Sequence, residues 1–256
     1  MDLAYTISGF VVGAIVGLTG VGGGSLMTPL LVLLFGVAPA TAVGTDLLYA
    51  AITKAGGVVV HSRRNNIDWP IVLRLAAGSI PGALATIGAL SAFPFDHAAF
   101  SRVITTSLGF ALMLTALAII GRDRIARWGR NSTGAWRRQW IGPLTIATGV
   151  VLGALVTLSS VGAGALGVAV LFFLYPKLPT VRIVGSDIAH AVPLTLVAGL
   201  GHAHLGTVDW GLLGALLVGS LPGIWLGSSL SSRVPEGVLR SGLAMILVVI
   251  GGKLVL

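Results

Sequence analysis

Apolar residues run along this chain in stretches of about 20, the length of a helix that spans the hydrocarbon core of a bilayer. Short clusters of proline, glycine or charged residues separate them. The predicted segments are 3–24, 25–37, 41–60, 70–91, 99–121, 140–160, 164–176, 180–201, 209–230 and 237–256. Because lipid cannot satisfy free backbone groups, the pattern predicts an all-α polytopic membrane protein.

Composition supports this class. The 256 residues are 55% hydrophobic and 9% charged, with a mean hydropathy of +0.98, whereas soluble domains carry roughly 25% charged residues. The formal net charge of +8 does not predict a nucleic-acid partner, because the arginines are concentrated in a few short loops, as the positive-inside rule expects. The absence of cysteine excludes disulfides, thiolate metal sites and thiol catalysis.

The two halves of the chain match each other at a shift of 140 to 141 positions. GAIVGLTGVGGGSL at 13–26 aligns with GALVTLSSVGAGAL at 153–166. Further along, GSIPG at 78–82 aligns with GSLPG at 219–223. So many ordered matches indicate an internal repeat.

Loop charges predict that the repeats have opposite orientations. Arg63 and Arg64 follow the third segment, whereas the equivalent loop at 201–210 has no lysine or arginine. Conversely, Lys177 and Arg182 lie in a loop whose equivalent in the first half is uncharged. Because basic loops stay in the cytoplasm, equivalent loops face opposite sides of the membrane.

Opposite orientation requires an odd number of crossings, or a re-entrant hairpin plus three spans, in each repeat. We therefore predict two inverted repeats, each a Gly-broken helical hairpin plus three transmembrane helices. The first membrane repeat is 1–121, a basic cytoplasmic linker is 122–139 and the second membrane repeat is 140–256. Both termini are expected outside. Residues 1–3 lack the basic start of a secretory signal peptide, so the first segment is expected to remain in the mature protein.

Glycine occupies four of the five positions 20–24, in the middle of an apolar stretch. Broken helices at the interface of inverted repeats hold the substrates of secondary transporters, and their free N–H groups favour a small anion. Tight packing of small residues is the alternative. Clustering and duplication favour a ligand site at 20–24 and 162–164. Packing is our interpretation for the scattered Gly78, Gly82, Gly149, Gly153 and Gly219.

The candidate substrate-binding residues combine the two breaks with neighbouring hydroxyl groups, which donate to oxyanion oxygens. They are Thr19, Gly20, Val21, Gly22, Gly23, Gly24, Ser25, Thr45, Ser159, Ser160, Val161, Gly162, Ala163, Gly164 and Ser186. The second break carries serine and alanine where the first has threonine and glycine. We expect it to contribute hydroxyls where the first contributes backbone.

Several of these stretches resemble the sulfite exporter TauE/SafE family of anion and sulfonate permeases. They are GLTGVGGGSLMTPLL at 17–31, AVGTDL at 42–47, the HSRRNNIDW loop at 61–69 and the weaker second copy. The resemblance covers nearly the whole chain. It implies movement of small sulfur-containing anions, such as sulfite or organosulfonates, across the bacterial plasma membrane without ATP hydrolysis. It does not separate the substrates of the family.

Four ionisable residues are predicted inside the membrane, where such groups are expensive and functional by default. Asp46 and Asp187 occupy equivalent repeat positions, and Lys54 lies on the same helical face as Asp46. His190 follows Asp187 by three residues. The aspartates either carry a coupled proton, anchor the opposite hairpin by accepting its N–H groups, or lie solvated at an interface. Lys54 either pairs with Asp46 or offers its charge to the anion, and His190 is either a proton relay or a hydrogen-bonded interior residue.

The remaining polar residues are expected near the ends of segments. His61, His97, His202 and His204 are predicted to be solvated, and His202 and His204 alone are too few for a metal site. Asp68 and Asp209 each precede a tryptophan and a new segment, a position typical of helix N-caps.

The function predicted from these features is secondary transport of a small sulfur-containing oxyanion, with export favoured and proton coupling left open. An anion channel shares the same features. A membrane-embedded enzyme is disfavoured, because G-x-S-x-G and H-E-x-x-H are absent. The expected partners are the small anion and the lipid bilayer, with a homodimer left open. No cofactor, metal or nucleic acid is expected.

Overall fold

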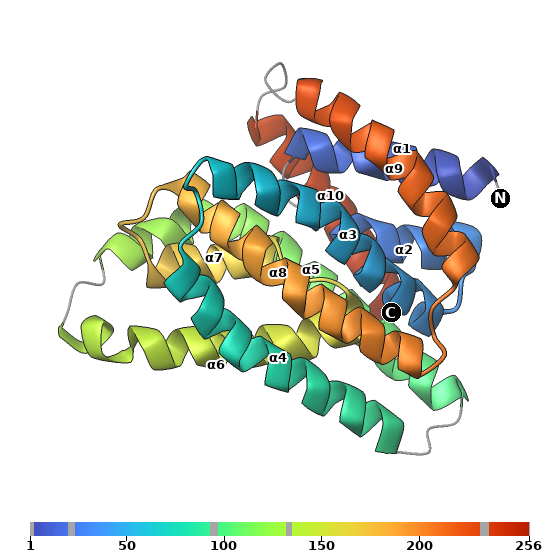
Figure 1. Cartoon of the computed structure of the whole chain (residues 1–256), viewed down its shortest axis with the longest axis horizontal. Helices are drawn as coiled ribbons and strands as arrows, with labels where there is room; N and C mark the ends of the chain where they lie inside the picture. The colour runs from blue at the N-terminus through green and yellow to red at the C-terminus, as the bar shows by residue number, and fades with distance from the viewer. Residues whose placement is uncertain (1–2, 20–23, 93–96, 132–134, 231–235, 256) are drawn as a thin grey trace.

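The computed structural model describes residues 3–19, 24–92, 97–131, 135–230 and 236–255. Throughout this part of the chain the secondary structure is helical (Figure 1). The helices are α1 (Leu3–Thr19), α2 (Gly24–Phe35), α3 (Pro39–Arg63), α4 (Trp69–Ala92), α5 (His97–Asn131), α6 (Ala135–Ser159), α7 (Ala165–Leu174), α8 (Thr180–His204), α9 (Trp210–Leu230) and α10 (Glu236–Val255). The all-α class is confirmed.

The helices follow the predicted segments closely, with one difference. Most of the predicted linker at 122–139 is helical, because α5 continues to Asn131 and α6 begins at Ala135. Arginine and alanine are good helix formers, and no proline interrupts 97–131, so the helix continues past its apolar part.

Six helices are long and apolar enough to cross a membrane: α3, α4, α5, α6, α8 and α9. Their exposed side chains are themselves largely apolar. Leu73, Leu117, Val151 and Val218 are each more than half exposed, and a soluble protein does not present so many large apolar side chains on its surface. The chain is a multi-pass membrane protein whose outer surface contacts lipid.

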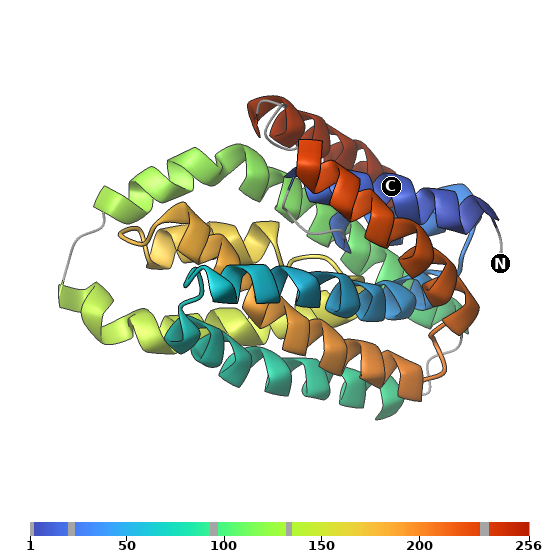
Figure 2. The ribbon, with the colours of Figure 1, turned by 45° about the horizontal axis from the view of Figure 1, so that its top comes forward.

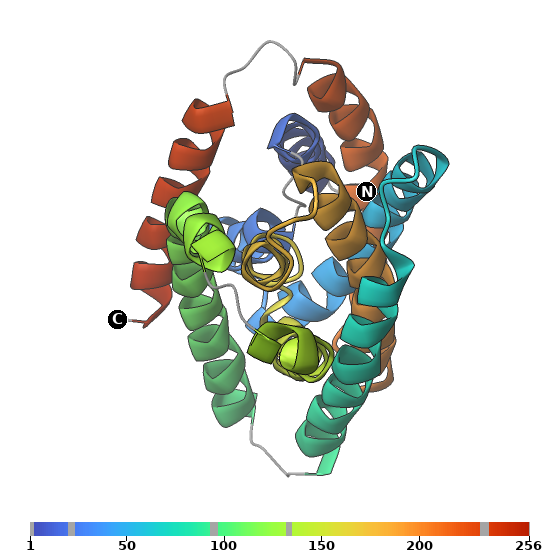
Figure 3. The same cartoon turned by 90° about the vertical axis from the view of Figure 1, so that its left-hand side faces the viewer.

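The long helices pack in pairs. Helix α1 lies against α9, α4 against α6, α3 against α8 and α5 against α10 (Figures 1 and 2). The short α7 lies among the longer helices when the molecule is viewed end-on, whereas α5 and α10 form one edge (Figure 3). Helices α3 and α8 are the most buried of the six long apolar helices.

The pairing follows the internal repeat. Helix α6 is the repeat equivalent of α1, and α9 is the equivalent of α4. The first helix of each half therefore packs on the fourth helix of the other half, so that α1 contacts α9 and α6 contacts α4. Contacts between helices of different halves therefore hold the two halves together.

Glycines allow two of these pairs to approach closely. A Cβ atom added to Gly149 on α6 would lie 2.2 Å from the carbonyl oxygen of Leu75 on α4. In the equivalent pair, a Cβ atom on Gly219 of α9 would lie 1.9 Å from the carbonyl oxygen of Thr6. Gly78, Gly82 and Gly153 show the same close backbone contacts, so the packing role predicted for the scattered glycines is confirmed.

Candidate functional site

The second glycine-rich break lies between α6 and α7. Ser160, Gly162 and Gly164 have φ angles of +58°, +124° and +140°. Only glycine adopts the last two readily, because it has no Cβ atom. Ser159 stabilises the turn, since its Oγ accepts a hydrogen bond from the N–H of Val161 at 3.2 Å. This sequence therefore ends one helix and starts the next inside the protein.

The break carries backbone donors that are left free. The N–H groups of Gly162, Ala163 and Gly164 have no hydrogen-bond partner in the described part of the chain, and all three residues are buried. The Gly164 N-cap of α7 has no side-chain cap either. Free N–H groups and the positive end of the helix dipole coincide here, which is the chemistry of an anion site.

Lys54 connects α3 to this break. Its Nζ donates a hydrogen bond to the carbonyl oxygen of Ala163 at 2.8 Å, and the side chain is 9% exposed. It lies close enough to act electrostatically on both Asp187 and Asp46, yet it forms no direct ion pair with either in the described structure. Of the two alternatives for Lys54, the direct pair with Asp46 is not formed, because the amino group binds the Ala163 carbonyl instead.

Asp46 is fully buried, with neighbours from both halves of the chain. The Thr28 hydroxyl on α2 donates to its Oδ2 at 2.5 Å. The Ser160 hydroxyl lies nearby, but neither Ser160 Oγ nor Asp46 Oδ1 completes a hydrogen bond with the described residues. A solvated interfacial position for this aspartate is excluded by its burial.

Asp187 occupies the equivalent place against α7. A Cβ atom on Gly167 would lie 1.9 Å from its Oδ1, so only glycine leaves room for the carboxylate at the first turn of that helix. Asp187 is 1% exposed, and its Oδ1 has no hydrogen-bond partner in the described structure. Each buried aspartate therefore lies against the helix that follows the break of its own repeat.

His190 is a hydrogen-bonded interior residue. Its Nε2 lies 2.8 Å from the Oγ of Ser79 on α4, and the side chain is fully buried. Tyr49 is the repeat equivalent of His190 and lies near Ser220, the equivalent of Ser79. The Nδ1 of His190 and the hydroxyl of Tyr49 have no partner in the described structure. Several buried polar atoms in the interior therefore lack a hydrogen-bond partner among the described residues.

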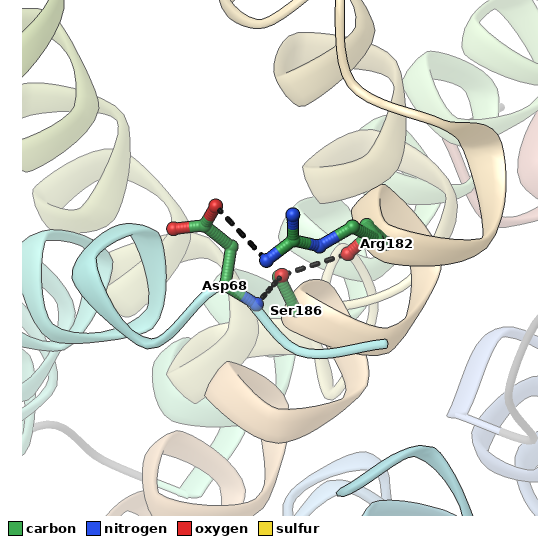
Figure 4. Close-up of polar contacts among 3 residues, drawn as sticks. All are labelled: Asp68, Arg182 and Ser186. Atoms are coloured by element: carbon green, nitrogen blue, oxygen red, sulfur yellow. Dashed lines mark hydrogen bonds and ion pairs between the residues drawn. The ribbon is translucent and has the colours of Figure 1, made fainter. Parts of the chain in front are cut away.

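Thr45 and Ser186 hold the two halves together. The N–H of Asp209 donates to Thr45 Oγ1 at 3.0 Å, and the N–H of Asp68 donates to Ser186 Oγ at 2.8 Å (Figure 4). These are equivalent contacts, each made from one repeat to the other. They support a framework role for both hydroxyls, and their predicted contact with substrate stays a prediction.

The two aspartates in this arrangement differ. Asp209 caps α9, because its Oδ1 accepts a hydrogen bond from the N–H of Leu212 at 2.9 Å, as predicted. The Oδ2 of Asp68 instead lies 3.7 Å from the guanidinium of Arg182 (Figure 4). Arg182 has no basic equivalent in the first half, where Thr41 takes its place. This ion pair was not predicted from the sequence.

His202 was predicted to be solvated, and this is wrong. It is fully buried, with Nε2 2.9 Å from the carbonyl oxygen of Thr157 and Nδ1 2.9 Å from the Oγ1 of Thr207. Because α6 ends at Ser159, the Thr157 carbonyl has lost its helical partner, and His202 satisfies it instead. Thr28 and Ser79 were also missed, since nothing in their local sequence marks them as partners of Asp46 and His190.

The first glycine-rich break falls largely outside the described residues. Gly20, Val21, Gly22 and Gly23 lie outside the described part of the chain, and Thr19, Gly24 and Ser25 are placed only as helix backbone. Their neighbour Leu26 packs on the hydrophobic cluster that includes Val161 of the second break.

No group of three or more His, Cys, Asp or Glu side chains is placed to hold a metal ion within the described ranges. The chemistry that these residues offer is recognition of charge by an amino group, hydroxyls, carboxylates and free backbone N–H groups.

Known proteins are similar to this chain along its whole length. A profile of the family described as Sulfite exporter TauE/SafE matches residues 5–254. "Probable membrane transporter protein YjnA" of Bacillus subtilis (strain 168) is 43% identical over 258 residues, covering 100% of both chains. "Probable membrane transporter protein YdhB" of the same organism is 31% identical, covering 91% of this chain and 92% of the relative. No solved structure gives a significant match.

Proposed function

Because this membrane protein belongs to the sulfite exporter TauE/SafE family, a family of membrane transporters, we propose that it carries a small sulfur-containing oxyanion across the membrane as a secondary transporter. Sulfite and organosulfonates are the proposed substrates, and export is the proposed direction. The observation that carries the proposal is the second break, where the buried N–H groups of Gly162, Ala163 and Gly164 have no partner among the described residues and the Lys54 amino group binds the Ala163 carbonyl.

The anion is proposed to lie between the two glycine-rich breaks, at 20–24 and 160–164. The second break supplies backbone donors and the Ser160 hydroxyl, which has no hydrogen-bond partner in the described structure. The first break supplies glycine backbone and the flanking Thr19 and Ser25 hydroxyls. The packing of Leu26 on the cluster that includes Val161 supports this placement.

The proposed architecture is a pair of inverted repeats, 1–121 and 140–256, that alternately open the site to each side. The reciprocal contacts support it: Thr45 accepts from the backbone of Asp209, and Ser186 from that of Asp68. Equivalent contacts of this kind arise when two copies of one unit are related by a two-fold axis. Breaking one set while the other holds is a simple route to alternating access.

We propose that the transport is coupled to protons. Asp46 and Asp187 are both buried close to Lys54, so two ionised carboxylates would leave a local charge of −1 before any anion entered. An anion next to that charge would be strongly repelled in the low dielectric of the interior. Protonation of one carboxylate makes the group neutral and permits binding. Anchoring of the opposite hairpin is the alternative, whereas the contact between Thr28 and Asp46 joins the aspartate to α2 of its own repeat.

The proposed location is the bacterial plasma membrane. The linker at 122–139 contains several arginines and is proposed to be cytoplasmic, with both termini outside.

Transport by purified protein in proteoliposomes tests this proposal. Vesicles loaded with unlabelled sulfite should accumulate labelled sulfite by saturable exchange, and net uptake of sulfite by empty vesicles should be stimulated by a proton gradient. A panel of sulfite, an organosulfonate, thiosulfate and sulfate identifies the substrate. Failure of every anion to exchange would reject the proposal. Flux that is fast and does not saturate would favour a channel.

A further inference from the structure

A cavity of about 820 Å³ lies where the end of α5 meets α7 and the start of α8. Three arginines line it, Arg122, Arg127 and Arg130, together with Asp123, Phe172 and Thr180. The side chains carry three positive formal charges and one negative. The cavity is separate from the residues around Lys54, and it has no part in the proposed transport site.

One wall of this cavity is formed by a single face of α5. Arg122, Ala126 and Arg130 recur every four residues, so they lie one above another on α5. Ala126 is small and buried, which leaves space between the two arginines.

Contacts between α5 and α7 hold that wall in place. The guanidinium of Arg122 lies 4.6 Å from the ring centroid of Phe172, a cation–π contact that orients it. A Cβ atom on Gly129 would lie 2.9 Å from the carbonyl oxygens of Phe172 and Phe173, so the helices touch closely. The Trp128 and Phe173 rings lie 5.1 Å apart. The arginines therefore project from a fixed surface.

Helix length places the cavity at the polar edge of the bilayer. The apolar helix Ala99–Arg130 has 32 residues, whereas about 20 suffice to cross the hydrocarbon core. Its last turns therefore extend beyond the hydrocarbon, to the level of lipid phosphates. Trp128 is 68% exposed there, as is typical of side chains at the head-group layer.

We propose that this cavity binds the phosphate group of an anionic ligand at the membrane surface. Guanidinium groups match phosphate oxygens with paired hydrogen bonds. The Thr180 side chain and the positive dipole end of α8, a 25-residue helix, add to the attraction. The phosphate comes either from an anionic lipid headgroup or from free inorganic phosphate, and basic pockets at this depth suit the former.

Native mass spectrometry of the detergent-purified full chain tests the proposal. Wild-type protein should retain phosphatidylglycerol in preference to phosphatidylcholine. The variant Arg127→Gln/Arg130→Gln should bind phosphatidylglycerol about tenfold more weakly, since each arginine near a lipid headgroup contributes substantially. The control variant Arg63→Gln/Arg64→Gln removes the same charge from exposed residues that do not line the cavity, and its affinity should match the wild type.

A second arm separates the two sources of phosphate. Inorganic phosphate that binds the wild type and displaces phosphatidylglycerol identifies free phosphate as the ligand, whereas retention of the lipid in excess phosphate identifies the headgroup. The proposal would be overturned if both arginine variants lost affinity for phosphatidylglycerol equally. It would also be overturned if the wild type bound phosphatidylglycerol no better than phosphatidylcholine and did not bind inorganic phosphate. None of these results depends on sulfite transport, so the two proposals fail independently.

Discussion

Lys54 on α3 donates a hydrogen bond from its Nζ to the carbonyl oxygen of Ala163, 2.8 Å away in the break between α6 and α7. The contact joins the two halves of the chain at the centre of the molecule. It leaves a buried amino group close to both Asp46 and Asp187, in a break whose backbone N–H groups at 162–164 have no partner among the described residues. Positive charge, backbone donors and proton-binding groups thus meet in one place.

Replacing Lys54 with methionine keeps the length of the side chain and removes its charge. We expect at least about a tenfold loss of sulfite exchange, together with destabilisation of about 1–3 kcal/mol from the unpaired Ala163 carbonyl. Proteoliposome exchange and thermal unfolding in detergent measure the two effects. Lys177→Met is the matched control, because Lys177 is exposed. Wild-type exchange by Lys54→Met would contradict a role for its charge.

Replacing Asp46 with asparagine keeps the shape of the side chain but removes the carboxyl group that can bind and release a proton. If the aspartate carries the coupled proton, net uptake should lose its dependence on a proton gradient, whereas exchange of sulfite for sulfite should persist. Thr28→Val is the informative comparison, since it removes the hydrogen bond to Asp46 without removing the carboxylate. A proton dependence that survives in Asp46→Asn would leave only the anchoring role.

Glycine at the second break is expected to be required for its shape. Gly164→Ala forces a Cβ atom onto a residue with φ of +140°, which costs about 1–3 kcal/mol and moves the free N–H groups. We expect weaker sulfite binding by isothermal titration. Gly36→Ala also places a Cβ atom on a residue of positive φ, but in a loop, with a milder φ of +64° and no atoms nearby, and should leave binding unchanged. An equal loss of binding in both variants would show that the effect is not specific to the second break.

The glycines of the first break are expected to be required because they leave the backbone accessible to the anion. Gly22→Val or Gly23→Val should abolish sulfite binding while the protein still inserts, because a side chain fills the space proposed for the anion. Binding is measured on protein recovered from the membrane fraction. Undiminished binding would remove this break from the site.

Tight helix packing predicts a different glycine effect. Gly149→Val should destabilise the protein by about 1–3 kcal/mol or prevent its folding, because overpacking separates α6 from α4. Gly88→Val on the exposed face of α4 is the control, since no atom lies near its Cβ position. Thermal unfolding of the two purified variants should differ clearly. Similar stability of both would argue against the close α4–α6 contact.

The hydroxyls of Thr45 and Ser186 separate a framework role from a binding role. Thr45→Val and Ser186→Ala each leave one backbone N–H without its acceptor, so each should lower stability by about 1–3 kcal/mol. A framework role predicts little change in the KM for sulfite. A severalfold rise in KM in either variant would instead indicate contact with the substrate.

The helical segments were largely predictable because each is an apolar run bounded by glycine, proline or charge. The packing role of Gly78 and Gly149 was also predictable, because small residues recur in both repeats at equivalent positions. The end of α5 was not, since its arginines looked like a loop and instead continue the helix to Asn131. His202 was missed because its partner is the carbonyl oxygen of Thr157, far away in the sequence.

The sequence by itself determined the membrane class, the segments, the repeat and the positions where helices break, because these depend on local hydrophobicity and backbone freedom. Only the tertiary structure decided which buried groups meet. Lys54 contacts Ala163, Asp187 lies against Gly167 and His190 lies beside Ser79, and all three contacts depend on how α3, α4, α7 and α8 cross. Such contacts join residues of different helices, and no periodicity within one helix encodes its partner.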